Sequence, residues 1–418
     1  MFALFVGAGN IIFPPIIGLQ SGEQMWISVI GFIISAVGLP IITIIALAKA
    51  GGGIKELTAP LGNVFGAILT IIVYLSVGPL FAIPRTAVVS YTIGIRPLIN
   101  NQLTSLVLCI YSIIYFIIVI IISIYPKVLL NSLSKVLAPI KIIALCILGT
   151  AAIFWPSGTN INSLYGDMAF THGFINGYLT MDTLGAMVFG IIIIKAINSL
   201  KVSNSMNLIQ YTILSGLITG ILLIVVYISL FILGNKTGTL LPNAINGADI
   251  LHTYVNYTFG KYGSLFLGIL IFVSCIVTAV GLISACGEFF SAYLTISYRK
   301  IIILLGIFSI LMSNVGLNEL ILISMPILTV IYPPCIILIL MNFIKTWWKK
   351  SDLVIISTMI ISFTCSVIIE LYKIKKLKIF IPNIITHMPL YQYNLAWLLP
   401  SLIVISLFLI YEVIFNKK

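Results

Sequence analysis

The first apolar segment of the sequence is interrupted by polar and helix-breaking residues. Gly7, Gly9 and Asn10 lie close together, and Pro14 and Pro15 follow them. Glycine is a poor helix former and proline removes a backbone donor, so this segment predicts a broken helix. In a membrane, a broken backbone persists only where protein or a water-filled cavity satisfies it, and such breaks are typical of the binding sites of secondary transporters. The alternative is a close-packed glycine crossing between helices, kinked by the prolines.

A second apolar segment carries small and polar residues around one carboxylate. Asp182 follows Thr180 and precedes Gly185 and Gly190. An ionisable residue inside a membrane segment is costly and is usually functional, and a carboxylate there would help to bind a cation or an amino group. Alternatively, Asp182 caps the helix that follows it, since aspartate is a favoured N-cap residue. The two roles are compatible.

Two more polar features lie inside apolar segments. Arg85 would be costly to bury, so we expect it to face a cavity or a partner, as an outer gate or a contact for a substrate carboxylate. The alternative is that it snorkels to the membrane interface. Ser274 and Thr278 are four residues apart and share a helix face, where two hydroxyls would suit Na⁺. The alternative for this pair is hydrogen bonding to carbonyls of their own helix.

The composition indicates a polytopic membrane protein. The chain has 418 residues, 61% of them hydrophobic and 8% charged, and its mean hydropathy is +1.21. Soluble domains carry about 25% charged residues, so a soluble fold of this size could not cover its surface. The net charge of +12 comes from short clusters between apolar runs, which set membrane topology and do not indicate nucleic acid binding. The 6 cysteines show no paired spacing, which argues against disulfides and zinc, and no cleavable signal peptide is visible.

Apolar runs of about 17 to 25 residues predict the membrane spans. We expect about twelve spans, at residues 2–19, 26–48, 65–92, 103–124, 135–155, 174–197, 206–234, 263–286, 300–316, 318–342, 353–371 and 395–415. Few residues precede the first glycine-rich break, so the first half of span 1 is nearly absent. The positive-inside rule places both termini in the cytoplasm, because most lysines and arginines then fall in inner loops. The lysines at positions 373–378 are the exception.

Four stretches of the chain resemble the bacterial branched-chain amino acid:cation symporters. They read FALFVGAGNIIFPP at residues 2–15, GPLFAIPRTA at 78–87, NGYLTMDTLGA at 176–186 and IYPPC at 331–335. The resemblance implies an all-α polytopic membrane fold of the amino acid–polyamine–cation type, which is leucine-transporter-like and has broken spans 1 and 6. The implied units are a first inverted repeat at residues 1–155, a second at 156–342, and two additional spans at 343–418. Members of the family carry further residues upstream, which complete the first half-helix.

The resemblance also implies how an amino acid would bind at the two breaks. The carbonyls of Phe5 and Ala8 would accept hydrogen bonds from its ammonium group. The N–H groups of Ala8 and Gly9, at a half-helix N-terminus, would hold its carboxylate. Tyr74 in span 3 would be the aromatic residue that faces the substrate. The residues that span 6 would add are Thr180, Asp182 and Gly185.

Na⁺ is the coupling ion that the resemblance implies, with two sites for it. The first would consist of the carbonyls of Ala3 and Val6, the hydroxyl of Thr278 and that of Ser274. The second would involve Asn10 and Thr180, with Asp182 as a further ligand. No other cofactor is expected.

The sequence therefore predicts a secondary active symporter that imports leucine, isoleucine or valine across the bacterial inner membrane. Alternating access would rock spans 1, 2, 6 and 7 against the rest. One alternative is coupling to H⁺ with Asp182 as the proton carrier, and another is an amino acid sensor or a degenerate form without transport. A membrane enzyme is the least expected class, because no cluster of histidine, aspartate and glutamate faces an interface. The expected partners are the amino acid and the lipid bilayer.

Overall fold

Helices make up the whole regular structure of the part of the chain that is described. The computed structural model describes residues 1–99, 104–124, 126–155, 162–198, 205–373 and 388–415. Within these ranges there is no strand, and eight helical stretches are long and apolar enough to cross a membrane. Each predicted span coincides with helix over most of its described residues, and the exceptions include the two predicted breaks. Fewer stretches than spans result because spans 1 and 2 form one stretch, Ala8–Ala50, and because the apolar helical stretches that the structure describes for spans 5, 9 and 12 are shorter than 18 residues.

The first predicted break separates two helices. Helix α1 spans Phe2–Phe5 and α2 spans Ala8–Ser21. Between them Val6 has ψ 83° and Gly7 is extended, with φ −104° and ψ −164°. Pro14 and Pro15 lie inside α2, which continues through both of them. The glycine, and not the proline pair, therefore marks the break.

The second predicted break lies between α10 (Ala169–Tyr178) and α11 (Asp182–Asn198). Met181 turns the chain there with φ 61°, a left-handed conformation that is rare for a residue with a side chain. Thr180 supports the turn, because its hydroxyl donates to the carbonyl of Gly177 at 2.7 Å and accepts from the N–H of Asp182 at 3.4 Å. Asp182 is thus the first residue of α11, and its carboxylate is directed to other helices.

Two further spans contain one-turn π-helices, which often mark functional positions. Helices α3 (Met25–Ile33) and α4 (Leu39–Ala50) are joined by the π-helix η2 (Ile34–Gly38), and a 3₁₀ turn, η1 (Gly22–Gln24), precedes them. Helices α6 (Gly62–Leu75) and α7 (Ala82–Gly94) are joined by the π-helix η4 (Ser76–Leu80). Gly78 in η4 has non-helical torsion angles beside Pro79, so this span also bends. The bend lies at the level of the broken helices, because Val77 and Ala82 face the same cavity as they do.

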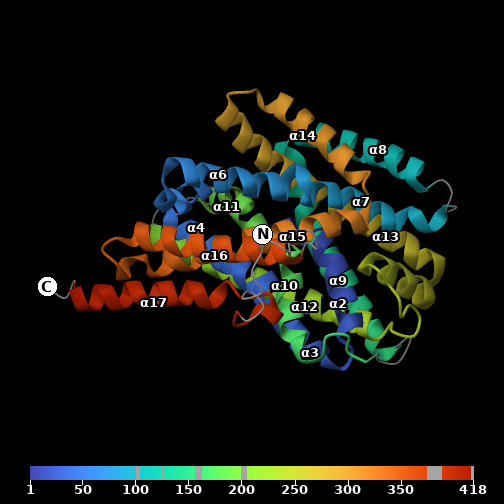
Figure 1. Ribbon diagram of the computed structural model, residues 1–418. Coiled ribbons are helices and arrows are strands. Elements are labelled where there is room, and N and C mark those ends of the chain that lie inside the picture. Colours follow the sequence, from blue (N-terminus) through green and yellow to red (C-terminus); the bar gives the residue numbers. More distant parts are fainter. Residues whose placement is uncertain (100–103, 125, 156–161, 199–204, 374–387, 416–418) are drawn as a thin grey trace.

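The remaining elements complete the molecule. The long helices are α8 (Thr104–Ile124), α9 (Pro126–Phe154), α12 (Ser205–Asn235), α13 (Gly247–Leu294), α14 (Tyr298–Ser313), α15 (Leu317–Ile344), α16 (Ser351–Lys373) and α17 (Leu398–Phe415). The short ones are α5 (Ile54–Leu57), η3 (Ala59–Leu61), η5 (Arg96–Leu98), η7 (Gly166–Met168), η8 (Lys345–Trp347) and η10 (Tyr391–Tyr393). Figure 1 shows α17 along one edge of the molecule, and α8 beside α14 at the opposite edge. Helix α13 bends at Gly260, which has non-helical torsion angles.

Glycines let one group of helices approach closely. A Cβ on Gly234 of α12 would lie 1.9 Å from the carbonyl oxygen of Pro15 in α2. A Cβ on Gly173 of α10 would lie 2.1 Å from the carbonyl oxygen of Ser28 in α3. Such backbone contact holds membrane helices together by van der Waals packing. We call α1–α4 and α10–α12 the bundle, and α6–α9 with α13–α15 the scaffold.

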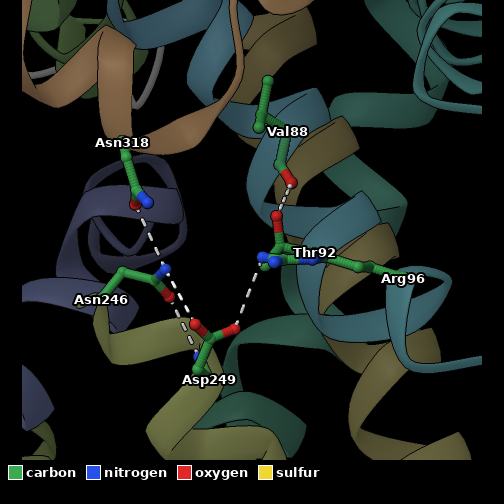
Figure 2. Close-up of polar contacts among 6 residues, drawn as sticks. All are labelled: Val88, Thr92, Arg96, Asn246, Asp249 and Asn318. Carbon is green, nitrogen blue, oxygen red and sulfur yellow. Dashed lines mark hydrogen bonds and ion pairs between the residues drawn. The ribbon is translucent and has the colours of Figure 1, made fainter. Parts of the chain in front are cut away.

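A polar cluster ties the ends of three scaffold helices together (Figure 2). The side chain of Asn246 caps α13 by accepting from the N–H of Asp249 at 3.0 Å, and it also donates to Asn318 of α15 at 3.2 Å. Arg96, which follows α7, lies 3.8 Å from the Asp249 carboxylate. These contacts fix the position where the chain enters α13. Of the lysines predicted as the exception to the positive-inside rule, Lys373 ends α16 and pairs with Glu370 at 2.6 Å, and the others lie outside the described residues.

Candidate functional site

The two helix breaks lie against each other in the interior. A Cβ on Gly9 would come within 3.2 Å of the Cα of Thr180, so the backbones of the two breaks are in contact. Gly7 packs against α13 in the same way, since a Cβ there would lie 3.0 Å from the Cγ2 atom of Thr278. The close glycine contact between helices, which was the alternative to a broken helix, is therefore present as well, and it involves the residues of the break. The lack of a side chain on Gly9 lets the backbones of the two breaks approach, and the lack of one on Gly7 makes room for the side chain of Thr278.

A cavity of about 40 Å³ lies where the breaks meet. Its wall includes these predicted site residues: Phe5, Ala8, Gly9, Asn10, Arg85, Thr180, Asp182, Gly185 and Thr278. The rest of its wall is mainly apolar and includes Val77, Phe189 and Leu282. The cavity thus joins polar groups of the breaks to an apolar surface.

Asp182 joins the two breaks through a buried hydrogen-bond cluster. Its Oδ2 atom accepts from the side-chain amide of Asn10 at 2.6 Å and from the Tyr227 hydroxyl at 2.9 Å. The Asn10 amide and the Tyr227 hydroxyl are 2.5 Å apart, and the other end of Asn10 accepts from the N–H of Gly7 at 3.0 Å. Charge-assisted bonds of this kind are stronger than neutral ones. We call Asn10, Asp182 and Tyr227 the carboxylate cluster.

Arg85 lies in the cavity wall and is 2% exposed, which rules out the snorkelling alternative. Its Nη1 atom donates to the carbonyl of Leu179 at 2.5 Å, and its Nη2 atom donates to Ser324 at 3.1 Å. The guanidinium also lies over the ring of Phe13, 5.2 Å from its centroid. Its Nε atom has no hydrogen-bond partner among the described residues. Arg85 therefore fixes the second break and leaves its Nε–H available for another partner.

The carbonyl of Val6 lies at the first break and accepts from two side chains. The Thr278 hydroxyl is 3.5 Å away, and the Lys141 Nζ atom of α9 is 3.2 Å away. The same Thr278 O–H lies 3.3 Å from the carbonyl of Ser274, as the alternative for this pair predicts, so its one hydrogen is shared between the two carbonyls. The Ser274 hydroxyl is buried without a partner among the described residues. Lys141 is completely buried. The ammonium group of Lys141 thus contacts the carbonyl of Val6, one of the oxygen atoms that the resemblance assigns to Na⁺.

Some predicted site residues lie away from the cavity wall. Tyr74 stacks on Phe289 with ring centroids 4.0 Å apart and does not line the cavity. Ala3, Val6 and Ser274 are buried but likewise do not line it. Val6 and Ser274 still contact Thr278 of the cavity wall through their backbone carbonyls.

The sequence analysis assigned no role to three side chains that the structure places at the site: Lys141, Tyr227 and Ser324. A signal for Lys141 was available, because a lysine inside an apolar span is as unusual as an aspartate or an arginine there. No comparable signal marks Tyr227 or Ser324. Tyrosine and serine are common in apolar helices, and only the packing of α12 and α15 brings these two to the breaks.

The chain was compared with known families, curated proteins and solved structures. The profile of the family described as "Branched-chain amino acid transport protein" matches residues 1–415. The branched-chain amino acid permease BrnQ of Salmonella typhimurium is 50% identical over 413 residues, covering 98% of this chain and 93% of the permease. The branched-chain amino acid transport system 3 carrier protein of Pseudomonas aeruginosa is 49% identical over 402 residues, covering 96% of this chain and 91% of the carrier.

Two solved structures share the fold at low sequence identity. One is Mhp1, a nucleobase-cation-symport-1 family transporter in a closed conformation with bromovinylhydantoin bound, which has a TM-score of 0.60 and 10% identity. It covers 97% of this chain, and the match covers 91% of Mhp1. The other is MhsT in complex with L-phenylalanine, with a TM-score of 0.59, 14% identity, and coverage of 98% of this chain and 96% of MhsT. The fold is therefore leucine-transporter-like, as predicted.

Proposed function

The chain belongs to the branched-chain amino acid transport protein family, and from this premise we propose a secondary active symporter that imports leucine, isoleucine and valine with Na⁺. The observation that carries the proposal is the meeting of two broken helices around one buried cavity. Freed backbone groups at such breaks bind the charged ends of small substrates in secondary transporters. The relatives are permeases and carriers, so the protein is a transporter and not an enzyme.

The charged ends of the amino acid are assigned to the first break. Helix α2 begins at Ala8, and the first N–H groups of a helix lack partners within it, so those of Ala8 and Gly9 suit the carboxylate. The carbonyl of Phe5 accepts from the N–H of Gly7 at 2.7 Å and has a second lone pair for the substrate ammonium. The unpaired Nε of Arg85 supports a role in holding the carboxylate or in closing the site above it.

The aliphatic side chain of the substrate is assigned to the apolar wall of the cavity. Val77, Phe189 and Leu282 supply that wall. An apolar pocket discriminates by only about 1–3 kcal/mol per methylene, so we expect overlapping affinities for leucine, isoleucine and valine. Ligand sites usually measure about 300–1,000 Å³, far more than this cavity, so its walls must move apart to admit the amino acid.

Two groups of oxygen atoms are candidates for Na⁺ coordination. The first contains the carbonyls of Ala3 and Val6 with Thr278 and Ser274. The second is formed by Asn10, Thr180 and Asp182, and it includes the carboxyl group of Asp182 beside the cavity. Binding of Na⁺ at either would couple to the substrate by stabilising the closed arrangement of the two breaks.

The membrane arrangement is part of the proposal. Two inverted repeats, residues 1–155 and 156–342, would be followed by two additional spans at 343–418. Both termini would face the cytoplasm of the bacterial cell, and the bundle would rock against the scaffold to expose the site to each side in turn.

Uptake into proteoliposomes tests the function directly. We expect radiolabelled isoleucine to accumulate under an inward Na⁺ gradient and to be displaced by leucine and valine, but not to accumulate under an H⁺ gradient alone. Accumulation driven only by H⁺ would contradict the Na⁺ assignment. Folded protein that binds isoleucine but never accumulates it would instead support a sensor or a degenerate transporter.

Proton coupling is the second candidate, and the buried carboxylate of Asp182 favours it. The variant Asp182→Asn separates the two ions, with Asp352→Asn at the exposed start of α16 as the control. If Asp182 carries the proton, Asp182→Asn loses the pH dependence of uptake. If the variant keeps the Na⁺ dependence and the pH profile of the control, proton coupling through Asp182 is excluded.

A further inference from the structure

Lys141 is a buried cation for which the proposed transport cycle has no use. It lies in α9 with no exposed surface, and the only hydrogen bond recorded for it among the described residues goes to the carbonyl of Val6. No carboxylate of the described residues lies within ion-pair distance of its Nζ atom. A buried charge without a counterion is costly, so its position needs a reason.

The carbonyl of Val6 holds the ammonium group of Lys141 in its buried position. Val6 belongs to the break between α1 and α2, so its carbonyl lies outside both helices and keeps its lone pairs available. The hydroxyl of Thr278, on the scaffold helix α13, is 3.5 Å from the same oxygen. The ammonium therefore lies where three elements meet: the break, α9 and α13.

These oxygen atoms are the first of the two candidate groups for Na⁺. A sodium ion and an ammonium group carry the same charge, both bind to carbonyl and hydroxyl oxygens, and two such charges at one carbonyl would repel each other. We propose that Lys141 is the resident cation of this position, a tethered replacement for one bound Na⁺. This rests on the proposed function, and it assigns the transported Na⁺ to the carboxylate cluster, where Asp182 supplies a negative charge.

The proposal predicts that removal of the lysine creates a new cation site. The variant Lys141→Ala leaves the carbonyl of Val6, with the hydroxyl of Thr278 beside it, next to an open space. We expect free Na⁺ or ethylammonium to bind there and to stabilise the variant, because a ligand that binds only the folded state raises its stability. Lys141→Met fills the space with an apolar chain, so neither cation should stabilise it beyond the wild type.

The first measurement is the melting temperature of the purified full chain without substrate. Wild type, Lys141→Ala, Lys141→Met and the control Lys49→Met would be compared in the chlorides of Na⁺, ethylammonium and choline at equal ionic strength. Lys49 is a suitable control because its ammonium lies over the ring of Phe343, outside the site. We expect Na⁺ and ethylammonium to raise the melting temperature of Lys141→Ala more than that of the other three proteins. An equal response in all four would overturn the proposal.

The second measurement is the Na⁺ dependence of isoleucine binding. We expect a higher Hill coefficient for Na⁺ in Lys141→Ala than in the wild type, because two ions rather than one would then be needed. An unchanged coefficient would count against a resident cation. Wild-type protein that binds no isoleucine in any salt would refute the proposed function, while the melting experiment would still test Lys141 without substrate.

Recovery of the variant is itself informative. If Lys141→Ala folds only when it is purified in Na⁺ or ethylammonium, the proposal is supported. If it folds in neither, Lys141→Ser takes its place, since serine keeps a polar group near Val6, leaves most of the space open and removes the charge. The same melting comparison then decides the question.

Discussion

At the scale of single residues, Tyr227 is the side chain whose role the structure defines most closely. Its hydroxyl contacts both Asn10 and Asp182, so Tyr227→Phe removes one donor from a buried carboxylate without changing the shape of the core. A hydrogen bond to a charged group is worth about 1.5–3 kcal/mol, and about 1.4 kcal/mol corresponds to a factor of ten. We expect the Na⁺ concentration for half-maximal isoleucine uptake to rise at least about tenfold.

Tyr211→Phe is the matched control, because Tyr211 lies on the same helix, α12, and is exposed. It should keep the wild-type Na⁺ dependence. If Tyr227→Phe also keeps it, the carboxylate cluster does not hold the coupling ion, and the group around Val6 becomes the better candidate.

How far the site can be predicted depends on how unusual each residue is for its surroundings. Asp182 and Arg85 are recognisable in the sequence because charge inside an apolar span is rare, and both line the cavity. Asn10 and Gly9 are recognisable because polar and helix-breaking residues are unusual in an apolar segment. Tyr227 is not, since a tyrosine fits an apolar helix and only the crossing of α2 and α12 brings its hydroxyl to Asn10. Such partners depend on tertiary contacts that no local pattern contains.

At the scale of helices, the glycine crossings of the bundle should be intolerant of even one added methyl group. Gly234→Ala would place its Cβ 1.9 Å from the carbonyl oxygen of Pro15, and neither backbone can move aside without separating α12 from α2. Overpacking of a core typically costs about 1–3 kcal/mol. We expect a lower melting temperature in detergent and reduced uptake.

Gly38→Ala provides the control for this prediction. Gly38 ends the π-helix η2 with φ −61°, and the nearest atom to an added Cβ is 3.9 Å away. Its substitution should leave the melting temperature close to that of the wild type. Equal behaviour of the two variants would show that α2 and α12 do not depend on close backbone contact.

The sequence predicts where the two helices break, but not which residue makes each break. The sequence marks the first break by two glycines and two prolines, yet Pro14 and Pro15 continue α2 and only Gly7 adopts an extended conformation. Proline is tolerated in a membrane helix when neighbouring groups satisfy the backbone that it frees. The second break turns at Met181, whose positive φ no residue preference would indicate. It is held by tertiary contacts, since Arg85 binds the carbonyl of Leu179.

At the scale of the whole molecule, rocking of the bundle requires that one boundary slides while another stays fixed. In the proposed motion, the boundary between the bundle helices α1 and α11 and the scaffold helix α13 would slide. A Cβ on Gly281 of α13 would lie 3.0 Å from Leu4 and 3.4 Å from Phe189. Within the bundle, α11 packs on α4, where a Cβ on Gly190 would lie 2.3 Å from Leu47.

Cysteine pairs at these two positions test the rocking motion. In a background without the native cysteines, Leu4→Cys with Gly281→Cys joins the bundle to the scaffold, and Leu47→Cys with Gly190→Cys joins two bundle helices. A short thiol-specific cross-linker should stop isoleucine uptake in the first pair and leave it in the second, and reduction of the cross-link should restore the first. Continued uptake by fully cross-linked Leu4–Gly281 protein would mean that α1 and α13 move together. Loss of uptake in both pairs would mean that the bundle flexes internally, so that access alternates by bending at η2 and at the breaks rather than by rotation of a rigid body.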